Sequence, residues 1–285
     1  ATDNLIAANA ASGHIFTWQP AAPLGVITNT FPLPVAQRGQ RSGVVALHWS
    51  GALVAVGNAK QDITLWKSSG NHPLSTMLAT GQSSVQKLAF SGNGAKLAAA
   101  TQNGALYVWN ISDLQASVPV TIASRYTPIT ALALSDDGRW LAVGAEKAPL
   151  QIWSLDEPAP QPPTLMQMRT EQIVRTIAFS SDNQWLAVGG DIFNFKGEPT
   201  ETGNNQSSPG FIRLWRLRAN TQRIIPSQPI DLSGHTQPVS ALAFSPRGDL
   251  LASGSLDSSV RLWELQTITN GQKAQIIVFL LQVLQ

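Results

Sequence analysis

The side chains best suited to acid–base chemistry are His235 and Asp257, a pair in which a carboxylate could orient an imidazole as a general base. The other histidines, His14, His48 and His72, sit on unrelated segments and do not form a metal-ligand spacing. The sequence contains no phosphate loop of the GxxxxGK type and no GxSxG nucleophile elbow. We therefore predict no metal and no cofactor.

Composition narrows the function classes further. The 285 residues include no cysteine, which excludes disulfide bridges, thiolate metal sites and cysteine nucleophiles. Lys and Arg number 19 against 17 Asp and Glu, so the net charge of +2 is too small to predict a nucleic-acid groove. Hydrophobic residues make up 43% and charged residues 13%, which excludes intrinsic disorder. The longest apolar run, 276–284, is interrupted by Gln282 and is far shorter than the ~20 residues of a membrane helix, so we expect no membrane span. A cytoplasmic location needs no special assumption and is our expectation.

Six short segments of alternating apolar residues end in tryptophan, and they set the organisation of the chain. Their tryptophans are Trp18, Trp66, Trp109, Trp153, Trp215 and Trp263. The successive spacings of 48, 43, 44, 62 and 48 residues are typical of propellers or helical arrays. Because the segments are short, rich in Val, Ile, Trp and Phe, and punctuated by Gly, Asp, Asn and Pro, strands are favoured over helices.

Each period contains four apolar runs, which are clearest from Gln228 onward as QPIDL, VSALAFS, LLASGS and VRLWEL. The run VSALAFS is predicted to be buried on both faces between packed sheets, with Val239, Ala241 and Ala243 on one face and Leu242 and Phe244 on the other. Turns such as SGNGA and SDDGR supply the backbone conformations that tight hairpins need. The sequence therefore predicts an all-β propeller of four-stranded antiparallel blades, with six blades visible and the first incomplete.

These repeats resemble those of the WD-repeat β-propeller family over nearly the whole chain. The last repeat matches best, because Gly234 and His235 are followed by Ser253, Asp257 and Trp263 at the family's spacing. The resemblance implies that His235, Ser253, Asp257 and Trp263 form a buried hydrogen-bonded tetrad, which gives His235 a structural role in place of a catalytic one. Such a network stabilises the fold only if every member is paired, since an unpaired buried polar group costs ~1–3 kcal/mol.

The earlier repeats depart from this pattern. The position of Asp257 is occupied by Ser12, Lys60, Asn103, Lys147 and Pro209 in turn, and no tryptophan is followed by Asp. We therefore expect the earlier blades to rely on apolar packing and turn chemistry. Trp140 and Trp185, which each open a third run, are expected to pack against the neighbouring blade.

The first and last strands bear on how the propeller is completed. Segments 3–9 and 14–18 read as third and fourth strands, so the inner strand of blade one is absent. Segment 275–280 reads as the outer strand of blade six, because its offset from Trp263 matches that of the outer strand one repeat earlier. We expect residues 1–285 to form a single propeller domain that is a fragment of a longer chain. The alternative is a six-bladed ring closed with one weak blade.

In WD-repeat propellers, the loop before the inner strand and the loop between the third and fourth strands open on one face, the top, where partners bind. The resemblance places the following candidate partner-binding residues there: Arg38, Arg41, Lys60, Arg125, Tyr126 and Lys147, with Glu146 beside the last. Blade five carries an inserted top-face loop, 191–209, whose base contains Phe193 and Phe195. We predict that these residues contact an acidic or phosphorylated segment of a protein partner. The alternative is that the cations are ordinary solvated charges and the insertion is disordered.

The predicted function is a non-catalytic scaffold that binds protein or peptide partners through the top-face loops, with no nucleic acid or membrane among its partners. The resemblance to propellers that occur in larger proteins and the abrupt ends of the sequence suggest that this chain is the sensor part of a larger bacterial signalling protein with attached effector domains. The alternative is a propeller enzyme, a hydrolase or lyase with a site in the central channel. Such an enzyme would need carboxylates, histidines or a metal on inner strands that here carry mainly Ala, Leu, Val, Phe and Ile.

Overall fold

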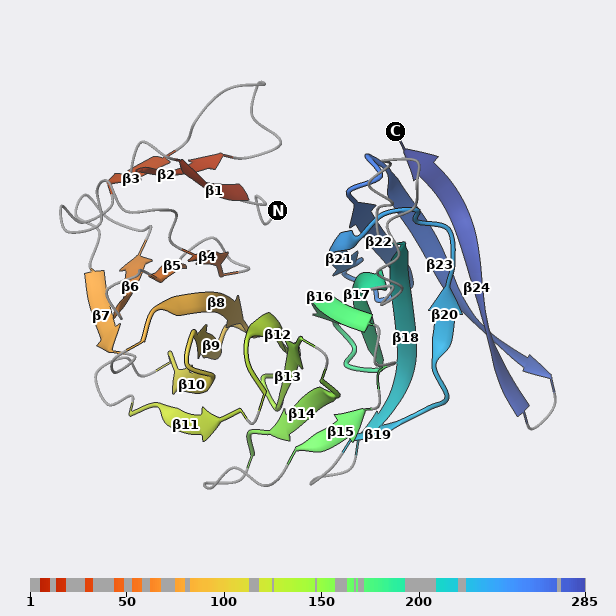
Figure 1. Cartoon of the computed structure of the whole chain (residues 1–285), viewed down its shortest axis with the longest axis horizontal. Helices are drawn as coiled ribbons and strands as arrows, with labels where there is room; N and C mark the ends of the chain where they lie inside the picture. The colour runs from red at the N-terminus through yellow and green to blue at the C-terminus, as the bar shows by residue number, and fades with distance from the viewer. Residues whose placement is uncertain are drawn as a thin grey trace, which may run out of the picture. The chain divides into compact units, whose positions relative to one another are not determined.

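A computed structural model describes residues 6–10, 14–18, 29–32, 44–48, 53–57, 62–67, 75–79, 83–112, 118–124, 126–146, 148–156, 163–166, 168, 172–192, 209–219, 224–270 and 273–284. These residues form 24 strands and no helix (Figure 1). The chain divides into two compact units, Ala1–Leu134 and Ser135–Gln285. Each unit is built from antiparallel sheets of short strands.

The first unit contains three sheets and one further strand. Blade one is β1 (Ile6–Ala10), β2 (His14–Trp18) and β3 (Asn29–Pro32). Blade two is β4 (Val44–Leu47), β5 (Leu53–Gly57), β6 (Asp62–Lys67) and β7 (Ser75–Ala79). Blade three is β8 (Val85–Phe90), β9 (Lys96–Thr101), β10 (Ala105–Asn110) and β11 (Val120–Ala123). The strand β12 (Ile129–Leu134) ends the unit.

The second unit opens with β13 (Trp140–Ala145), β14 (Leu150–Ser154) and β15 (Thr164–Met166), its strands of blade four. Blade five is β16 (Gln172–Phe179), β17 (Trp185–Ile192) and β18 (Gly210–Ala219), with the short strands β19 (Ile224–Pro226) and β20 (Ile230–Leu232) both paired to β18. Blade six is β21 (Val239–Phe244), β22 (Leu250–Ser255), β23 (Val260–Asn270) and β24 (Lys273–Leu284).

Within each unit, neighbouring blades contact each other through their first strands. The strand β8 contacts β4 in the first unit, and β21 contacts β16 in the second. Sheets that meet along one edge and follow chain order in this way are the defining arrangement of a propeller. The predicted all-β propeller of four-stranded antiparallel blades is confirmed.

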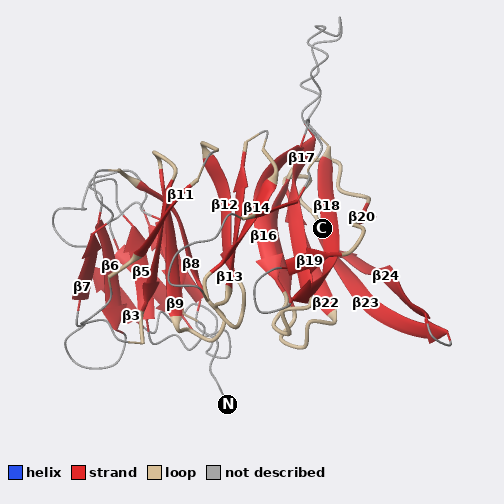
Figure 2. Cartoon of the chain, turned by 90° about the horizontal axis from the view of Figure 1, so that it is seen from below, coloured by secondary structure: helices blue, strands red, loops and turns tan. Residues whose placement is uncertain are grey.

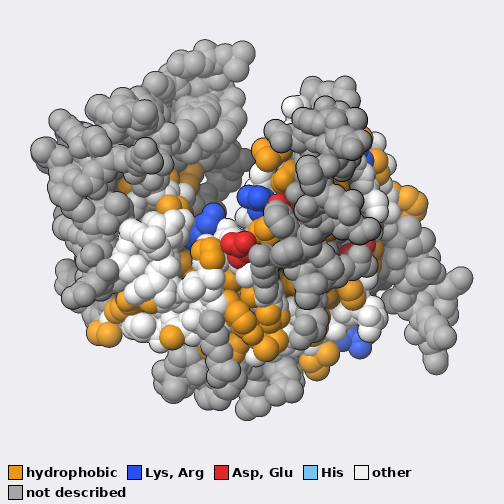
Figure 3. Space-filling view, in the orientation of Figure 1, with side chains coloured by type: hydrophobic (Ala, Val, Ile, Leu, Met, Phe, Trp, Pro, Cys, Tyr) orange, Lys and Arg blue, Asp and Glu red, His pale blue; other side chains and the backbone are white. Residues whose placement is uncertain are grey.

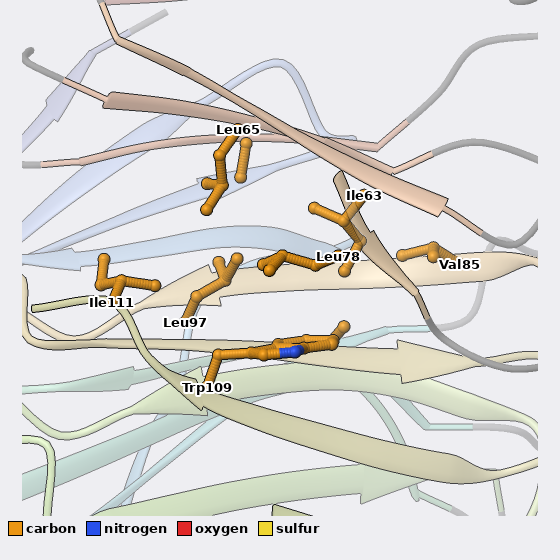
Figure 4. Packing of buried hydrophobic residues seen from close by; sticks show 9 residues of the cluster. Ile63, Leu65, Leu78, Val85, Leu97, Trp109 and Ile111 are labelled. Carbon is orange, nitrogen blue, oxygen red and sulfur yellow. The ribbon is translucent and has the colours of Figure 1, made fainter. Parts of the chain in front are cut away.

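The apolar cores lie between blades rather than within one sheet. Between blades two and three, the cluster comprises Ala55, Ile63, Leu65, Leu78, Val85, Leu97, Ala99, Trp109 and Ile111 (Figure 4). Trp109 is 1% exposed and packs toward blade two. Because a single sheet cannot cover its own apolar face, each blade depends on its neighbour for burial.

A matching core joins blades five and six. Trp185, Ile212, Leu214 and Leu232 of blade five pack there with residues of blade six that include Val239, Leu251, Trp263 and Leu265. Trp185 therefore packs against the neighbouring blade, and Trp140 is likewise buried. The indole of Trp263 occupies in this core the place that Trp109 has in the other.

Glycine permits the close approach of neighbouring blades. A Cβ added at Gly57 would lie 2.6 Å from Val85 Cγ1, and one added at Gly189 would lie 2.8 Å from Val239 Cγ1. In both cases the glycine lies in the strand that follows the inner strand of its blade, β5 or β17. It faces the first residue of the next blade's inner strand, β8 or β21. A side chain at either glycine would push the two sheets apart.

A serine closes the first hairpin of several blades, a feature that was not singled out from the sequence. The serines at this place are Ser91, Ser135, Ser180 and Ser245. In each, Oγ accepts a hydrogen bond from the backbone amide five residues later and donates one to an Asp or Asn side chain of the turn. The residue three after each serine has positive φ, supplied by Gly94, Gly138, Asn183 and Gly248. Local turn chemistry thus sets the register of the first two strands.

These turns also link one blade to the next by hydrogen bonds. In the first unit, His48 Nε2 lies 3.3 Å from Gly94 O. In the second, the Asp136 amide donates to Asn183 Oδ1 at 2.8 Å, and Ser181 Oγ donates to Pro246 O at 2.7 Å. The turns therefore hold neighbouring blades together at the hairpin end, in addition to the apolar cores.

Three sequence predictions need correction. The strand β21 is not buried on both faces, because Ala241 and Ala243 are exposed. A bulge between Val239 and Ala241 shifts the alternation, so these two residues do not share a face. The outer strand predicted over 275–280 is longer, at Lys273–Leu284. The blade-five insertion was predicted to begin at residue 191, but residues 191 and 192 still belong to β17, which continues to Ile192.

Candidate interaction surface

The structure brings the four tetrad residues together at one end of blade six. His235 lies in the loop before β21, and Asp257 lies in the turn between β22 and β23. His235 Nδ1 is 2.9 Å from Asp257 Oδ2, and His235 Nε2 is 2.8 Å from Ser253 Oγ. The indole Nε1 of Trp263 donates to Ser253 Oγ at 2.9 Å. The two kinds of loop predicted to share the top face therefore meet in this blade.

These contacts form one hydrogen-bond chain in which every partner is satisfied. Because Trp263 can only donate, Ser253 accepts from it and turns its own hydroxyl hydrogen toward His235 Nε2. The imidazole then donates from Nδ1 to the Asp257 carboxylate. The His235 side chain is 1% exposed and both of its nitrogens are engaged. Ser253 is fully buried and is shared with the indole of Trp263, so this Ser–His–Asp arrangement is enclosed within blade six.

The carboxyl group of Asp257 locks the turn that carries it. Burial alone would raise the pKa of Asp257, but hydrogen bonds from Ser259, His235 and the backbone amide of Thr236 outweigh burial and hold it well below the ordinary value of 3.8. Oδ1 accepts from the Ser259 amide at 2.9 Å and from its hydroxyl at 2.5 Å. The ionised carboxylate thus ties the loop before β21 to the turn before β23.

Strand register explains why the other blades lack the tetrad. Ser253 lies two residues after Leu251, the residue paired with Trp263. The same place in blades two to five is taken by Val56, Ala99, Val143 and Val188. In blade four, the buried indole Nε1 of Trp153 accordingly has no hydrogen-bond partner among the described residues. The earlier blades replace a polar acceptor with apolar packing.

Blade three has a smaller polar network at the corresponding end. Asn103, which stands where Asp257 does, accepts at Oδ1 from Thr101 Oγ1 at 2.7 Å. Its backbone amide donates to Ser83 Oγ at 3.1 Å, and Ser84 Oγ donates to Gln102 Oε1 at 3.0 Å. The loop before the inner strand and the turn between β9 and β10 are therefore tied together in this blade too.

Of the eight predicted partner-binding residues, the structure describes Tyr126. Arg38, Arg41, Lys60, Arg125, Lys147, Phe193 and Phe195 lie outside the described residues. Tyr126 is half-buried, and its backbone amide donates to Ser124 Oγ at 3.2 Å. Glu146 is exposed. The side chains of Trp18 and Trp66 are also outside the description, although both residues lie in strands.

Two arginines missed by sequence reasoning stand at the base of the blade-five insertion. Arg175 binds the carboxylate of Asp191 through Nε and Nη2, and Asp191 pairs across the sheet with Gly210 at the start of β18. The Asp191 side chain is 5% exposed, whereas that of Arg175 is 47% exposed. The hydrogen bonds that Arg175 donates to Asp191 raise the pKa of Arg175 above its ordinary value. This insertion thus begins beside a fixed guanidinium group.

Arg213 forms a second pair in the same blade. Its side chain is 7% exposed, and its Nε donates to Asp231 Oδ1 at 2.7 Å across from β20. Nη1 also lies 3.4 Å from Gln172 Oε1. The sequence offers one sign of this arginine. Arg213 in IRLW and Arg261 in VRLW both stand two residues before the repeat tryptophan, at the same position of their strands.

A bulge places Arg175 outward from the sheet. The register of β16 against β17 shifts between Val174 and Thr176, so Arg175 is the extra residue. A Cβ at Gly190 would lie 1.8 Å from Ile173 O, so the strand opposite the bulge needs glycine here.

On the face seen in Figure 3, the described charged side chains form only small, separate groups. No group of three or more His, Asp or Glu residues suited to a metal occurs within the described segments.

No helix among the described residues is long and apolar enough to cross a membrane.

The described sheets, their edge-to-edge contacts and the cores between them define the chain as a β-propeller. The propeller domain of Cps50 (Swd1) from Myceliophteria thermophila superposes with a TM-score of 0.67 at 15% identity, covering 91% of this chain and 74% of that one. At this identity the likeness concerns the fold.

The family is indicated by sequence matches. The family described as WD domain, G-beta repeat (WD40) matches residues 71–110, 164–191 and 227–264. The chain therefore carries WD40 repeats, as the resemblance implied.

Similar stretches occur in several WD-repeat relatives. Protein Mut11 of Chlamydomonas reinhardtii is 61% identical over 36 residues, which is 13% of this chain and 10% of that protein. The F-box-like/WD repeat-containing protein TBL1X of Mus musculus is 44% identical over 55 residues, 19% of this chain and 10% of that protein. Coronin-7 of Mus musculus is 39% identical over 66 residues, 22% of this chain and 7% of that protein. The matches thus span a tenth or less of the curated relatives' length.

Proposed function

We propose that this chain is a non-catalytic scaffold that binds protein or peptide segments through the loops at the tetrad end of its blades. The observation that carries the proposal is the pre-ordered base of the blade-five insertion. Asp191 is held by Arg175 at the point where the insertion leaves β17, and Arg213 is held by Asp231 beside it. A loop that starts from a fixed base loses less conformational entropy when a partner binds.

The same end is ordered in other blades. The tetrad fixes the loops of blade six, and Asn103 with Ser83 fixes those of blade three. Loops presented on a rigid framework carry binding functions disproportionately often. WD-repeat relatives such as TBL1X and coronin-7 support a role in protein interaction at the level of the fold family.

We propose an acidic or phosphorylated segment as the bound partner, on the basis of the basic residues in the loops of blades two to four. Cations around a rim steer an acidic partner toward the site, and desolvated aromatic side chains add affinity. A longer parent chain with effector domains, a bacterial signalling role and a cytoplasmic location are parts of the same proposal.

The test compares two triple variants on an array of acidic, phosphorylated and neutral peptides. Charge reversal of Arg41, Lys60 and Arg125 to Glu should weaken binding to the acidic and phosphorylated peptides. The matched control reverses Arg216, Arg218 and Arg247 to Glu; Arg247 lies in a first-hairpin turn, and the other two lie on β18. Equal binding by both variants would contradict the proposed partner chemistry. A broad hydrolase screen tests the non-catalytic part, which measurable turnover would overturn.

A further inference from the structure

The outer strand of blade six differs from every other described outer strand. The outer strands β3, β7, β11, β15, β19 and β20 have 4, 5, 4, 3, 3 and 3 residues. The outer strand β24 has 12 and pairs along β23, which has 11. Figure 2 shows this hairpin extending beyond the other strands of its sheet.

The strand β24 exposes apolar side chains on both of its faces. Phe279 and Leu280 are each 44% exposed, Leu281 is 51%, Val283 is 41% and Leu284 is 44%. Successive residues of a strand point to opposite faces, so the exposed neighbours Phe279 and Leu280 lie on different faces. An isolated exposed leucine is ordinary, whereas a continuous apolar strip marks an interaction site.

Among the described strands, β24 is paired along one edge only. It is the terminal strand of the order β21-β22-β23-β24, and its partner is β23. Its anchor is Val278, which packs against the core between blades five and six and pairs with Leu265. The opposite edge presents backbone amides and carbonyls that an added strand could bind.

The usual protections of an open edge are nearly absent. Natural edges are kept short or carry charges and prolines that prevent further pairing. After Lys273 the strand has no charged residue and no proline, and the sequence 276–281 is wholly apolar. One irregularity occurs, a register shift that leaves Leu281 as the extra residue. The stretch before it, 273–280, is still longer than any other described outer strand.

We propose that β24 pairs with β24 of a second copy of this chain in an antiparallel fashion, forming a two-fold dimer through a continuous sheet. The strand suits pairing with itself, because it is apolar on both faces and has no charge after Lys273, so residues 274–284 meet no like charge in a second copy. A charged partner strand would have to desolvate its charges against Phe279 and the neighbouring leucines. The contact uses the same surface of both copies, so pairing closes at two.

The first test measures the mass of the 285-residue chain by sedimentation velocity over a range of concentrations. The wild-type chain should approach twice its monomer mass of 30.5 kDa as concentration rises. The double variant Phe279→Lys, Leu281→Lys should remain monomeric, because a dimer would bring four added positive charges onto two paired strands. The matched control Ile225→Lys, Leu256→Lys changes side chains that are 52% and 59% exposed on the same unit but outside β24, and it should dimerise like the wild type.

The second test uses the absence of cysteine from the sequence. A short bismaleimide reagent should join two Leu281→Cys chains, whereas Leu256→Cys chains should stay single. Circular dichroism melting of each variant checks that it is folded. A wild-type chain that is monomeric at every concentration overturns the proposal. The alternative is then that a strand of a different protein pairs with the open edge of β24. Dimers that both lysine variants retain, or assemblies larger than two, also overturn it.

Discussion

The indole Nε1 of Trp263 donates a hydrogen bond to Ser253 Oγ at a distance of 2.9 Å, and the same hydroxyl lies 2.8 Å from His235 Nε2. One serine thus satisfies two buried polar groups on two different segments. The equivalent Trp153 has Val143 in that place, and its indole nitrogen has no described partner. The polar chain of blade six therefore depends on Ser253.

Replacement of Ser253 by Ala should lower the free energy of unfolding by ~1–3 kcal/mol, because Trp263 and His235 each lose a partner in a site without water access. Urea unfolding followed by tryptophan fluorescence measures the change. Ser240→Ala is the control, since Ser240 is exposed and its hydroxyl donates a long hydrogen bond of 3.4 Å to Gly254 O. Equal effects of the two substitutions would show that the tetrad adds no stability.

Gly189→Ala should destabilise the contact between blades five and six by ~1–3 kcal/mol, because the new methyl group overlaps Val239. Gly254 occupies the same strand position in blade six, and a Cβ there would meet nothing closer than Ala241 Cβ at 3.6 Å. Gly254→Ala should therefore stay within ~0.5 kcal/mol of the wild type. Denaturant midpoints of the two variants, measured side by side, decide whether blade spacing depends on the glycine. A neutral Gly189→Ala variant would contradict the close approach.

Acidification should weaken the contact between blades two and three. Burial lowers the pKa of His48 from its ordinary value of 6.5, although its hydrogen bond with Gly94 opposes this shift. The unfolded chain therefore takes up a proton at a higher pH than the folded chain does, so the contribution to stability is complete above pH 6.5 and declines as the pH falls below it. The thermal midpoint should fall more in the wild type than in His48→Gln between about pH 7.5 and 5.5. Parallel pH profiles would argue against this role of His48.

Asp257 should contribute stability at neutral pH that disappears in acid. Its folded pKa is depressed below the ordinary 3.8, so the contribution is present above that value and is lost as the pH falls through the folded pKa. Asp257→Asn should therefore have a lower denaturant midpoint than the wild type at pH 7, with the gap narrowing below about pH 4. A gap that is the same at both pH values would indicate that the carboxylate charge does not matter.

The order of strands could be predicted from local features alone. Apolar alternation, the six tryptophans and the hairpin turns are set by residues close together in the chain. The strands β10, β14, β18 and β23 contain Trp109, Trp153, Trp215 and Trp263, although β18 and β23 continue four and seven residues beyond them. The tetrad could be anticipated because its four residues stand at a recognisable spacing in one repeat. The serine of the first hairpin could also have been found, since it ends each of the second runs.

The pairing of Arg175 with Asp191, the exposure of Ala241 and the length of β24 were decided by the tertiary structure. Bulges at Arg175 and Ser240 change which face a side chain occupies, and no alternation in the sequence marks where an extra residue enters the strand. Burial depends in turn on which neighbouring sheet is present, as the contrast between Gly189 and Gly254 shows. Local residue order thus determines the strands and turns, whereas packing between blades determines which surfaces remain available for binding, because burial is a property of the neighbours rather than of the segment itself.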